Sequence, residues 1–122
     1  MFPTAKVFEH TGCMIVYQPS DGRIPVVGVA APGFIGNMVA MNRDGIAMGV
    51  DMSPSGNCDA GRPGFNSLVL VRHAMHLSHS AQDAVATIAA VQRGVSWLYP
   101  ISDGKHNQAA VVEAGHKVDD LD

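Results

Sequence analysis

The chain has 122 residues, of which 47% are hydrophobic and 16% are charged, and its formal net charge is −3 at pH 7. A chain of this length is expected to form one domain, residues 1–122, with a core of modest size. The few charges include no basic stripe, so nucleic-acid binding is not expected. No apolar run approaches the roughly 20 residues that a membrane span needs. The charged fraction is below the average of about 25% for globular domains, so part of the surface is expected to be covered.

The N-terminal sequence MFPTAKVFEH has no basic start followed by an apolar stretch, and it therefore predicts no secretory signal. We expect a cytoplasmic protein, in which Cys13 and Cys58 remain free thiols. Cys13 begins a predicted strand and is interpreted as a small core residue, whereas Cys58 lies in a predicted loop. Reactive cysteines need a neighbouring base or a helix N-terminus, and the sequence predicts neither beside them.

Four extended segments are predicted in the first half of the chain. Residues 13–18 are rich in β-branched and aromatic residues and end at the turn signal PSDG. Further strands are predicted at residues 24–31, 34–42 and 46–52, and the tight turn between the last two favours positive φ at Gly45. The last two strands are nearly apolar on both faces, so the sheet is expected to be covered on both sides.

Residues 53–64, SPSGNCDAGRPG, form a long loop by composition, and such loops are often functional or flexible. Helices are predicted at residues 65–79 and 81–92. The second helix should begin with Ser80 as its N-cap and Asp83 in a capping-box position, and end at Arg93 with Gly94 as the residue after the cap. The remaining predicted strands are residues 96–102 and 109–114, and a further short strand begins within residues 115–122.

This order of elements predicts an α+β fold, in which a mostly antiparallel sheet carries a helical pair on one face. The other face also needs a cover, and these residues do not supply one. His73, His76 and His79 lie three residues apart in the first helix, so consecutive pairs could share a metal or form a polar helix flank. No cysteine or carboxylate completes a ligand set, so we predict no metal and no cofactor.

One carboxylate, Asp51, stands at a strand end among apolar neighbours. Its side chain could accept backbone N–H groups of the following MSPSG turn, or it could belong to a functional site. Trp97 and Tyr99 in SWLYP could stack on a ligand, although their strand spacing is more typical of core residues.

Several segments in a fixed order carry a resemblance to a known family. They are GFIGNMVAMNRDGIAMGVDMSPSG, RPGFNSLVLVRHAM, SAQDAVATIAAV and SWLYPISDGKHNQAAVVEAG. Together they resemble the cysteine-type N-terminal nucleophile (Ntn) hydrolases of the choloylglycine hydrolase and penicillin acyltransferase-like group, over roughly residues 12–120. The resemblance implies a four-layer αββα sandwich. It also implies cleavage or transfer of acyl groups on linear amides by an N-terminal cysteine whose own α-amino group is the base.

Compared with the pattern of the family that it resembles, the chain also shows departures. The chain lines up with the family after the nucleophile, and Asp51 stands where the family has a strand-end Asn. An amide can donate to an oxyanion, whereas an ionised carboxylate cannot. We therefore expect an Ntn-hydrolase-like core fragment that is inactive as a lone chain and forms a homo-oligomer.

Two alternatives remain open at this point. One is a non-catalytic structural or small-ligand-binding domain, which would hold a small amide ligand near Asp51, Met52, residues 53–64 and Trp97. The other is a weak hydrolase that uses Cys13 or Cys58 as its nucleophile.

Overall fold

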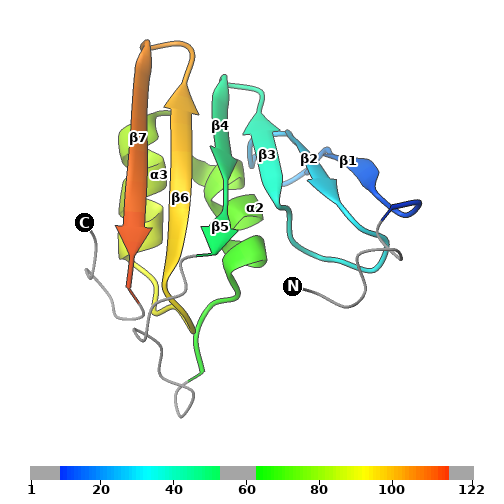
Figure 1. Cartoon of the computed structure of the whole chain (residues 1–122). Coiled ribbons are helices and arrows are strands. Elements are labelled where there is room, and N and C mark those ends of the chain that lie inside the picture. Colours follow the sequence, from blue (N-terminus) through cyan, green and yellow to red (C-terminus); the bar gives the residue numbers. More distant parts are fainter. Residues whose placement is uncertain (1–8, 53–62, 116–122) are drawn as a thin grey trace.

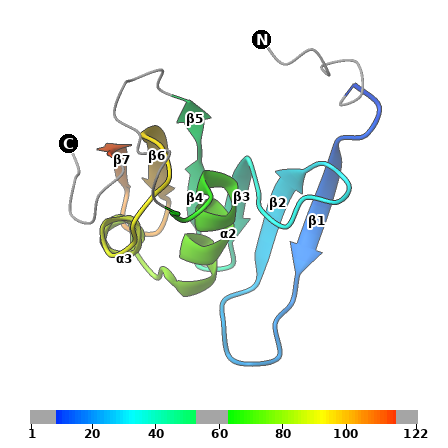
Figure 2. The ribbon, with the colours of Figure 1, turned by 90° about the horizontal axis from the view of Figure 1, so that it is seen from below.

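The computed structural model describes residues 9–52 and 63–115. Its strands form one antiparallel sheet, and two helices lie together on one side of that sheet in both views (Figure 1 and Figure 2). The α+β prediction, with a helical pair on one face of an antiparallel sheet, is confirmed. The strands are β1 (Cys13–Tyr17), β2 (Val26–Ala30), β3 (Val39–Asn42), β4 (Ile46–Gly49), β5 (Asp51–Met52), β6 (Trp97–Asp103) and β7 (Gln108–Ala114).

The strands are ordered β1-β2-β3-β4-β6, with β7 on the far side of β6. β5 also pairs with β6, and it continues the register of β4. That common register places Gly49 opposite Pro100. Proline has no N–H to donate, so the ladder is interrupted there. The predicted strand of residues 46–52 is therefore one extended segment with a break at Val50, whose N–H donates to Met38 on the β3 side instead (3.1 Å).

The strand predicted at residues 34–42 is shorter than expected and begins only at Val39. A turn precedes it, in which Gly33 has φ of 86° and the N–H of Phe34 donates to Ala31 (3.0 Å). The chain then meets the start of the first helix, where the N–H of Asn37 donates to the carbonyl of Leu68 (2.9 Å). These tertiary contacts replace the strand pairing that the apolar composition favours.

Helix α2 (Ser67–Leu77) begins after Asn66, whose side chain accepts from the N–H groups of Leu68 and Val69. Helix α3 (Ala81–Ala89) begins at the predicted N-cap, since Ser80 Oγ accepts from the N–H of Asp83 (3.1 Å). The Asp83 carboxylate accepts from the N–H of His79 (2.9 Å), one residue before the cap. Neither of these helices, the two in the described ranges, is long and apolar enough to cross a membrane.

The predicted end of α3 is wrong in one respect. The helix is capped at Ala90, and Gly94 does not adopt positive φ. The side chain of Arg93 takes the capping role instead, because its Nη1 donates to the carbonyls of Ile88 and Val91 at the helix end. Its Nε donates to the carbonyl of Gly115 (2.5 Å). A buried guanidinium with several donors satisfies helix-end carbonyls that a left-handed glycine would otherwise serve.

The core lies between the helices and one face of the sheet. The core forms because the apolar side of each helix packs against every second side chain of the strands. Tyr99 belongs to it, as its strand spacing indicated. Its other most buried members are Val26, Ala40, Ile46, Met48, Leu70, Val71, Ala74, Met75, Ala84, Ile88 and Ala114.

Candidate functional site

The sheet face opposite the helices is largely apolar and open to solvent. The cross-strand registers place one set of side chains on this outer face, from Met14 opposite Val29 to Pro100 opposite Val111. Its large apolar members are between 47% and 72% exposed, and they are Met14, Val16, Val29, Val39, Met41 and Val111. Contiguous exposed apolar surface of this kind marks an interaction surface. The outer face is therefore the candidate functional surface.

Asp51 lies on this outer face. It is exposed, and it pairs across the sheet with Leu98 of β6, which in turn pairs with Glu113 of β7. The two acidic residues thus flank Leu98 in one cross-strand row. Adjacent strands are about 4.8 Å apart, so the backbones of Asp51 and Glu113, which are two strands apart, are separated by about 10 Å. The turn that could hydrogen-bond the Asp51 carboxylate falls within residues 53–62, outside the described residues.

The structure places the predicted ligand residue Trp97 on the other face. Trp97 pairs with Met52, and successive strand residues point to opposite faces. The Trp97 ring packs against the core on the helix side, away from Asp51. Asp51 and Trp97 therefore do not line one groove. The side chain of Met52 and residues 53–62 lie outside the described part.

Cys13 is half-buried at the start of β1, and its Sγ donates to the carbonyl of Ala30 (3.4 Å). The acceptor is a backbone carbonyl of the paired strand, which is not a base that could activate the thiol. Cys58 lies outside the described residues. Burial raises the pKa of the Tyr99 hydroxyl, so this phenol stays protonated near neutral pH and does not act as a base.

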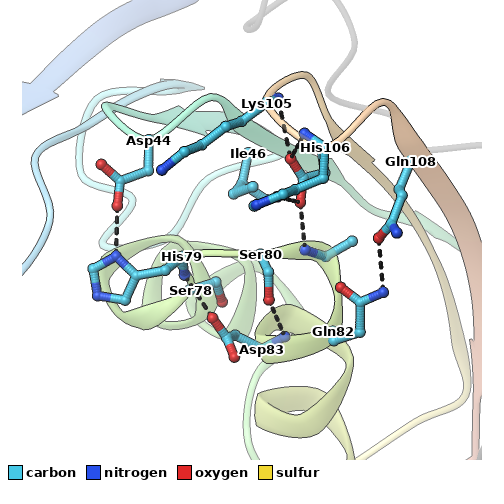
Figure 3. A network of polar contacts seen from close by, with 12 residues as sticks. Asp44, Ile46, Ser78, His79, Ser80, Gln82, Asp83, Lys105, His106 and Gln108 are labelled. Atoms are coloured by element: carbon cyan, nitrogen blue, oxygen red, sulfur yellow. Dashed lines mark hydrogen bonds and ion pairs between the residues drawn. The ribbon is translucent and has the colours of Figure 1, made fainter.

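The three histidines that the sequence placed in one helix have separate environments, and His79 lies beyond the end of α2. His76 is buried, and its Nδ1 donates to the carbonyl of Ile24 (2.8 Å). His79 is exposed, and its Nδ1 lies 2.5 Å from the Asp44 carboxylate (Figure 3). His73 lies against the ring of Phe65. Across the described ranges, no group of three or more His, Cys, Asp or Glu residues is placed to hold a metal ion.

Two polar residues, for which the sequence pattern predicts no special role, hold key positions in the fold. Asn42 ends β3 and is 4% exposed. Its Nδ2 donates to the carbonyls of Met75 (3.0 Å) and Ser78 (2.7 Å), and its Oδ1 accepts from the N–H groups of Asp44 (3.1 Å) and Ile46 (3.0 Å). One side chain thus closes the β3–β4 turn and satisfies the end of α2.

Asp103 has the corresponding role at the end of β6. Its carboxylate accepts from the N–H of Ala81 (3.0 Å) at the start of α3, and from the N–H groups of Lys105 (3.1 Å) and His106 (2.9 Å) in the β6–β7 turn. His106 Nδ1 also donates to it (2.8 Å). Figure 3 shows Lys105 and His106 of this turn close to Ser80 at the start of α3. Asn42 and Asp103 both stand in the segments that carry the family resemblance, and here both serve the fold.

The fold and the outer face define an α+β protein whose sheet is covered on one side and apolar on the other. The family model of acyl-coenzyme A:6-aminopenicillanic acid acyl-transferases matches residues 6–121, and the chain belongs to this family. The resemblance to Ntn hydrolases of the penicillin acyltransferase-like group is thereby confirmed.

An uncharacterized protein of Archaeoglobus fulgidus is also similar to the chain. It is 36% identical over 110 residues, which are 88% of this chain and 18% of that protein. The chain thus spans less than a fifth of the length of the curated relative that it matches.

Proposed function

We propose that this chain is the scaffold part of an Ntn-type amide hydrolase or acyltransferase, and that a second sheet packs on its outer face in the active protein. The observation that carries this proposal is the exposed apolar surface opposite the helices. Two sheets that pack face to face bury alternate apolar residues of both. Such packing would give the αββα sandwich that the family resemblance implies.

The length of the relative supports the same proposal. The matched part of the Archaeoglobus fulgidus protein is 18% of its length, so that protein has ample further chain for a second sheet. The exposed members of the outer face lie on β1, β2, β3 and β7, across the width of the sheet. A surface of this width suits a sheet better than a single helix or a small ligand.

Asp51 is on the outer face, so in this proposal its carboxylate lies between the two sheets. An ionised carboxylate there can bind a cationic group, but it opposes the negative charge that develops on a carbonyl oxygen during acyl transfer. The described thiol, Cys13, has no base beside it. We therefore propose that the 122-residue chain alone does not perform the family reaction, and that the nucleophile comes from other polypeptide.

Acyl transfer by the isolated chain can be tested directly. After incubation with a p-nitrophenyl acyl ester, we expect no acyl group on Cys13 or Cys58, because neither thiol has an activating base in this proposal. Intact mass spectrometry followed by peptide mapping measures the result. The same thiols should be alkylated by iodoacetamide after denaturation, which shows that they are chemically competent. An acyl adduct on either cysteine of the native chain would contradict the proposal and favour a hydrolase with its own nucleophile.

We further propose that, in the isolated chain, the outer face packs against the outer face of a second copy. Met41→Glu places a charge in the middle of this surface, where Met41 is 51% exposed. We expect the dissociation constant of the oligomer to rise at least about tenfold, because a charge buried in an apolar interface is costly. Sedimentation velocity over a range of concentrations measures it. Ala86→Glu is the matched control, since Ala86 is exposed on α3 and should not alter association. A monomeric parent chain at micromolar concentration would refute the self-association.

A further inference from the structure

A surface hollow of about 310 Å³ lies on the helix side of the sheet, between the end of β1 and helix α2. Tyr17 and Gln18 line it from the strand side, Arg23 from the β1–β2 connection, and Arg72 and His76 from the helix. It is far from Asp51 in the sheet, because β1 is the edge strand beyond β2 and β3. Neither the family match nor the proposed function assigns a role to this cationic hollow.

The guanidinium of Arg72 is held in place by three contacts. Its plane lies over the ring of Tyr17, with Cζ 4.1 Å from the ring centroid. Its Nη1 donates to the carbonyl of Ile35 (2.8 Å), and its Nε donates to Nε2 of His76 (3.4 Å). These contacts use two of its five N–H groups. Much of the entropy cost of ordering a long side chain around a ligand is therefore already met by the fold.

His76 fixes the direction of this donor set. Its Nδ1 faces the carbonyl of Ile24, which can only accept, so the proton of the neutral ring is on Nδ1 (2.8 Å). Nε2 is then an acceptor, and it receives the Nε–H of Arg72. The Tyr17 ring also meets the imidazole edge-on, at 5.8 Å between centroids. His76 thus acts as a buried support that orients Arg72.

The charges around the hollow leave Arg72 uncompensated. Arg23 is paired with Asp21 (2.8 Å), so these two groups largely cancel. Within residues 9–52 and 63–115, no carboxylate forms an ion pair with Arg72. Burial lowers the pKa of the nearby His73, so His73 does not become a competing cation at neutral pH.

We propose that this hollow binds a small oxoanion, a phosphate or a carboxylate group, through Arg72. A guanidinium with free N–H groups on one edge binds two oxygens of such a group at once. The Tyr17 ring below the guanidinium supports it by a cation–π contact and keeps its edge toward the hollow. Because the site is open to solvent, binding should be weak and should weaken further with added salt.

The test uses the 122-residue chain and two probes, inorganic phosphate and acetate. Amide and side-chain shifts of Tyr17, Arg72 and His76 are followed by NMR during each titration at low ionic strength. We expect saturable shifts centred on these residues with at least one probe. The probe that binds more tightly shows whether the hollow prefers a phosphate or a carboxylate group. Arg72→Gln should weaken binding about tenfold or more, as expected for loss of a charge-assisted pair.

The matched control is Arg43→Gln, which removes one positive charge from an exposed position outside the hollow. It should change the affinity less than about threefold, because Arg43 does not line the hollow and acts on a bound anion only through water. If neither probe gives saturable shifts, or if Arg72→Gln and Arg43→Gln have the same effect, the site does not exist. Unchanged amide shifts elsewhere in Arg72→Gln show that the variant is folded. The result is independent of acyl transfer and of the outer face.

Discussion

Replacing Asn42 with alanine is expected to lower the free energy of unfolding by about 3 kcal/mol, because four buried hydrogen bonds are lost at once. The carbonyls of Met75 and Ser78 at the end of α2 lose their donor, and the N–H groups of Asp44 and Ile46 lose their acceptor. Groups that stay buried without a partner pay most of their desolvation cost. Urea unfolding followed by circular dichroism measures the change.

Two further variants separate this effect from a general loss of polar groups. Asn42→Asp retains the acceptor but places a carboxylate against two carbonyls, so it should be at least as destabilising as alanine. Asn66→Ala removes an exposed N-cap at the other end of α2 and should cost about 1 kcal/mol. If Asn42→Ala costs no more than Asn66→Ala, the assigned role of Asn42 is incorrect.

Replacing Asp103 with alanine is expected to lower the midpoint of thermal unfolding by more than about 10 °C, because one buried carboxylate holds both the β6–β7 turn and the start of α3. Its acceptor oxygens serve the N–H groups of Ala81, Lys105 and His106. A matched control is Gln108→Ala, which removes the exposed side-chain contact between β7 and Gln82 and should have a small effect. Equal midpoints for Asp103→Ala and the parent chain would exclude this role.

Asp103 should also make stability depend on pH. Burial acts to raise the pKa of its carboxyl, but hydrogen bonds from His106 and from the N–H of Ala81 outweigh burial and leave the pKa below its ordinary value. A carboxyl with a depressed folded-state pKa stabilises the fold above its unfolded pKa of about 3.9, and this contribution is lost as pH falls through the folded-state value. The parent chain should therefore lose stability below about pH 5. Asp103→Asn should lose less over the same range, and an equally steep loss would contradict this assignment.

The sequence was sufficient to predict the fold class because its local signals agree with one another. The turn at Gly45 has the predicted positive φ, 86°, and Ser80 caps α3 as predicted. Apolar periodicity identified both described helices and the strands of the sheet. These features depend on residues close in the chain, which is why composition and spacing reveal them.

The errors arise where distant segments decide the local structure. The segment before Val39 bends away from strand geometry because Asn37 meets the start of α2. Arg93 replaces Gly94 at the end of α3 because the carbonyl of Gly115 lies within reach of its guanidinium. No local pattern contains this information. The family resemblance highlighted the segments of Asn42 and Asp103, but only the tertiary contacts show what these side chains do.

The candidate site was predicted in part. Strand alternation gives the face of each residue once the register is known, but the sequence does not give the register. Asp51 and Trp97 are close in the sheet, yet they lie on opposite faces. The two-sided apolar pattern did indicate that a second cover is needed, and the open outer face agrees with that expectation.

The positions of Asn42 and Asp103 bear on how this protein can change over evolutionary time. Both stand at the end of the sheet where the β3–β4 and β6–β7 turns meet, and Gly104 N–H donates to Gly45 across them (3.0 Å). Asp51 pairs with Leu98, five residue pairs along the same ladder from Ile46 and Asp103, which is about 17 Å away. Mutations at position 51 therefore leave these polar joints untouched. A substitution at position 51 can therefore change the chemistry of the outer face without disturbing the contacts that fix the two turns.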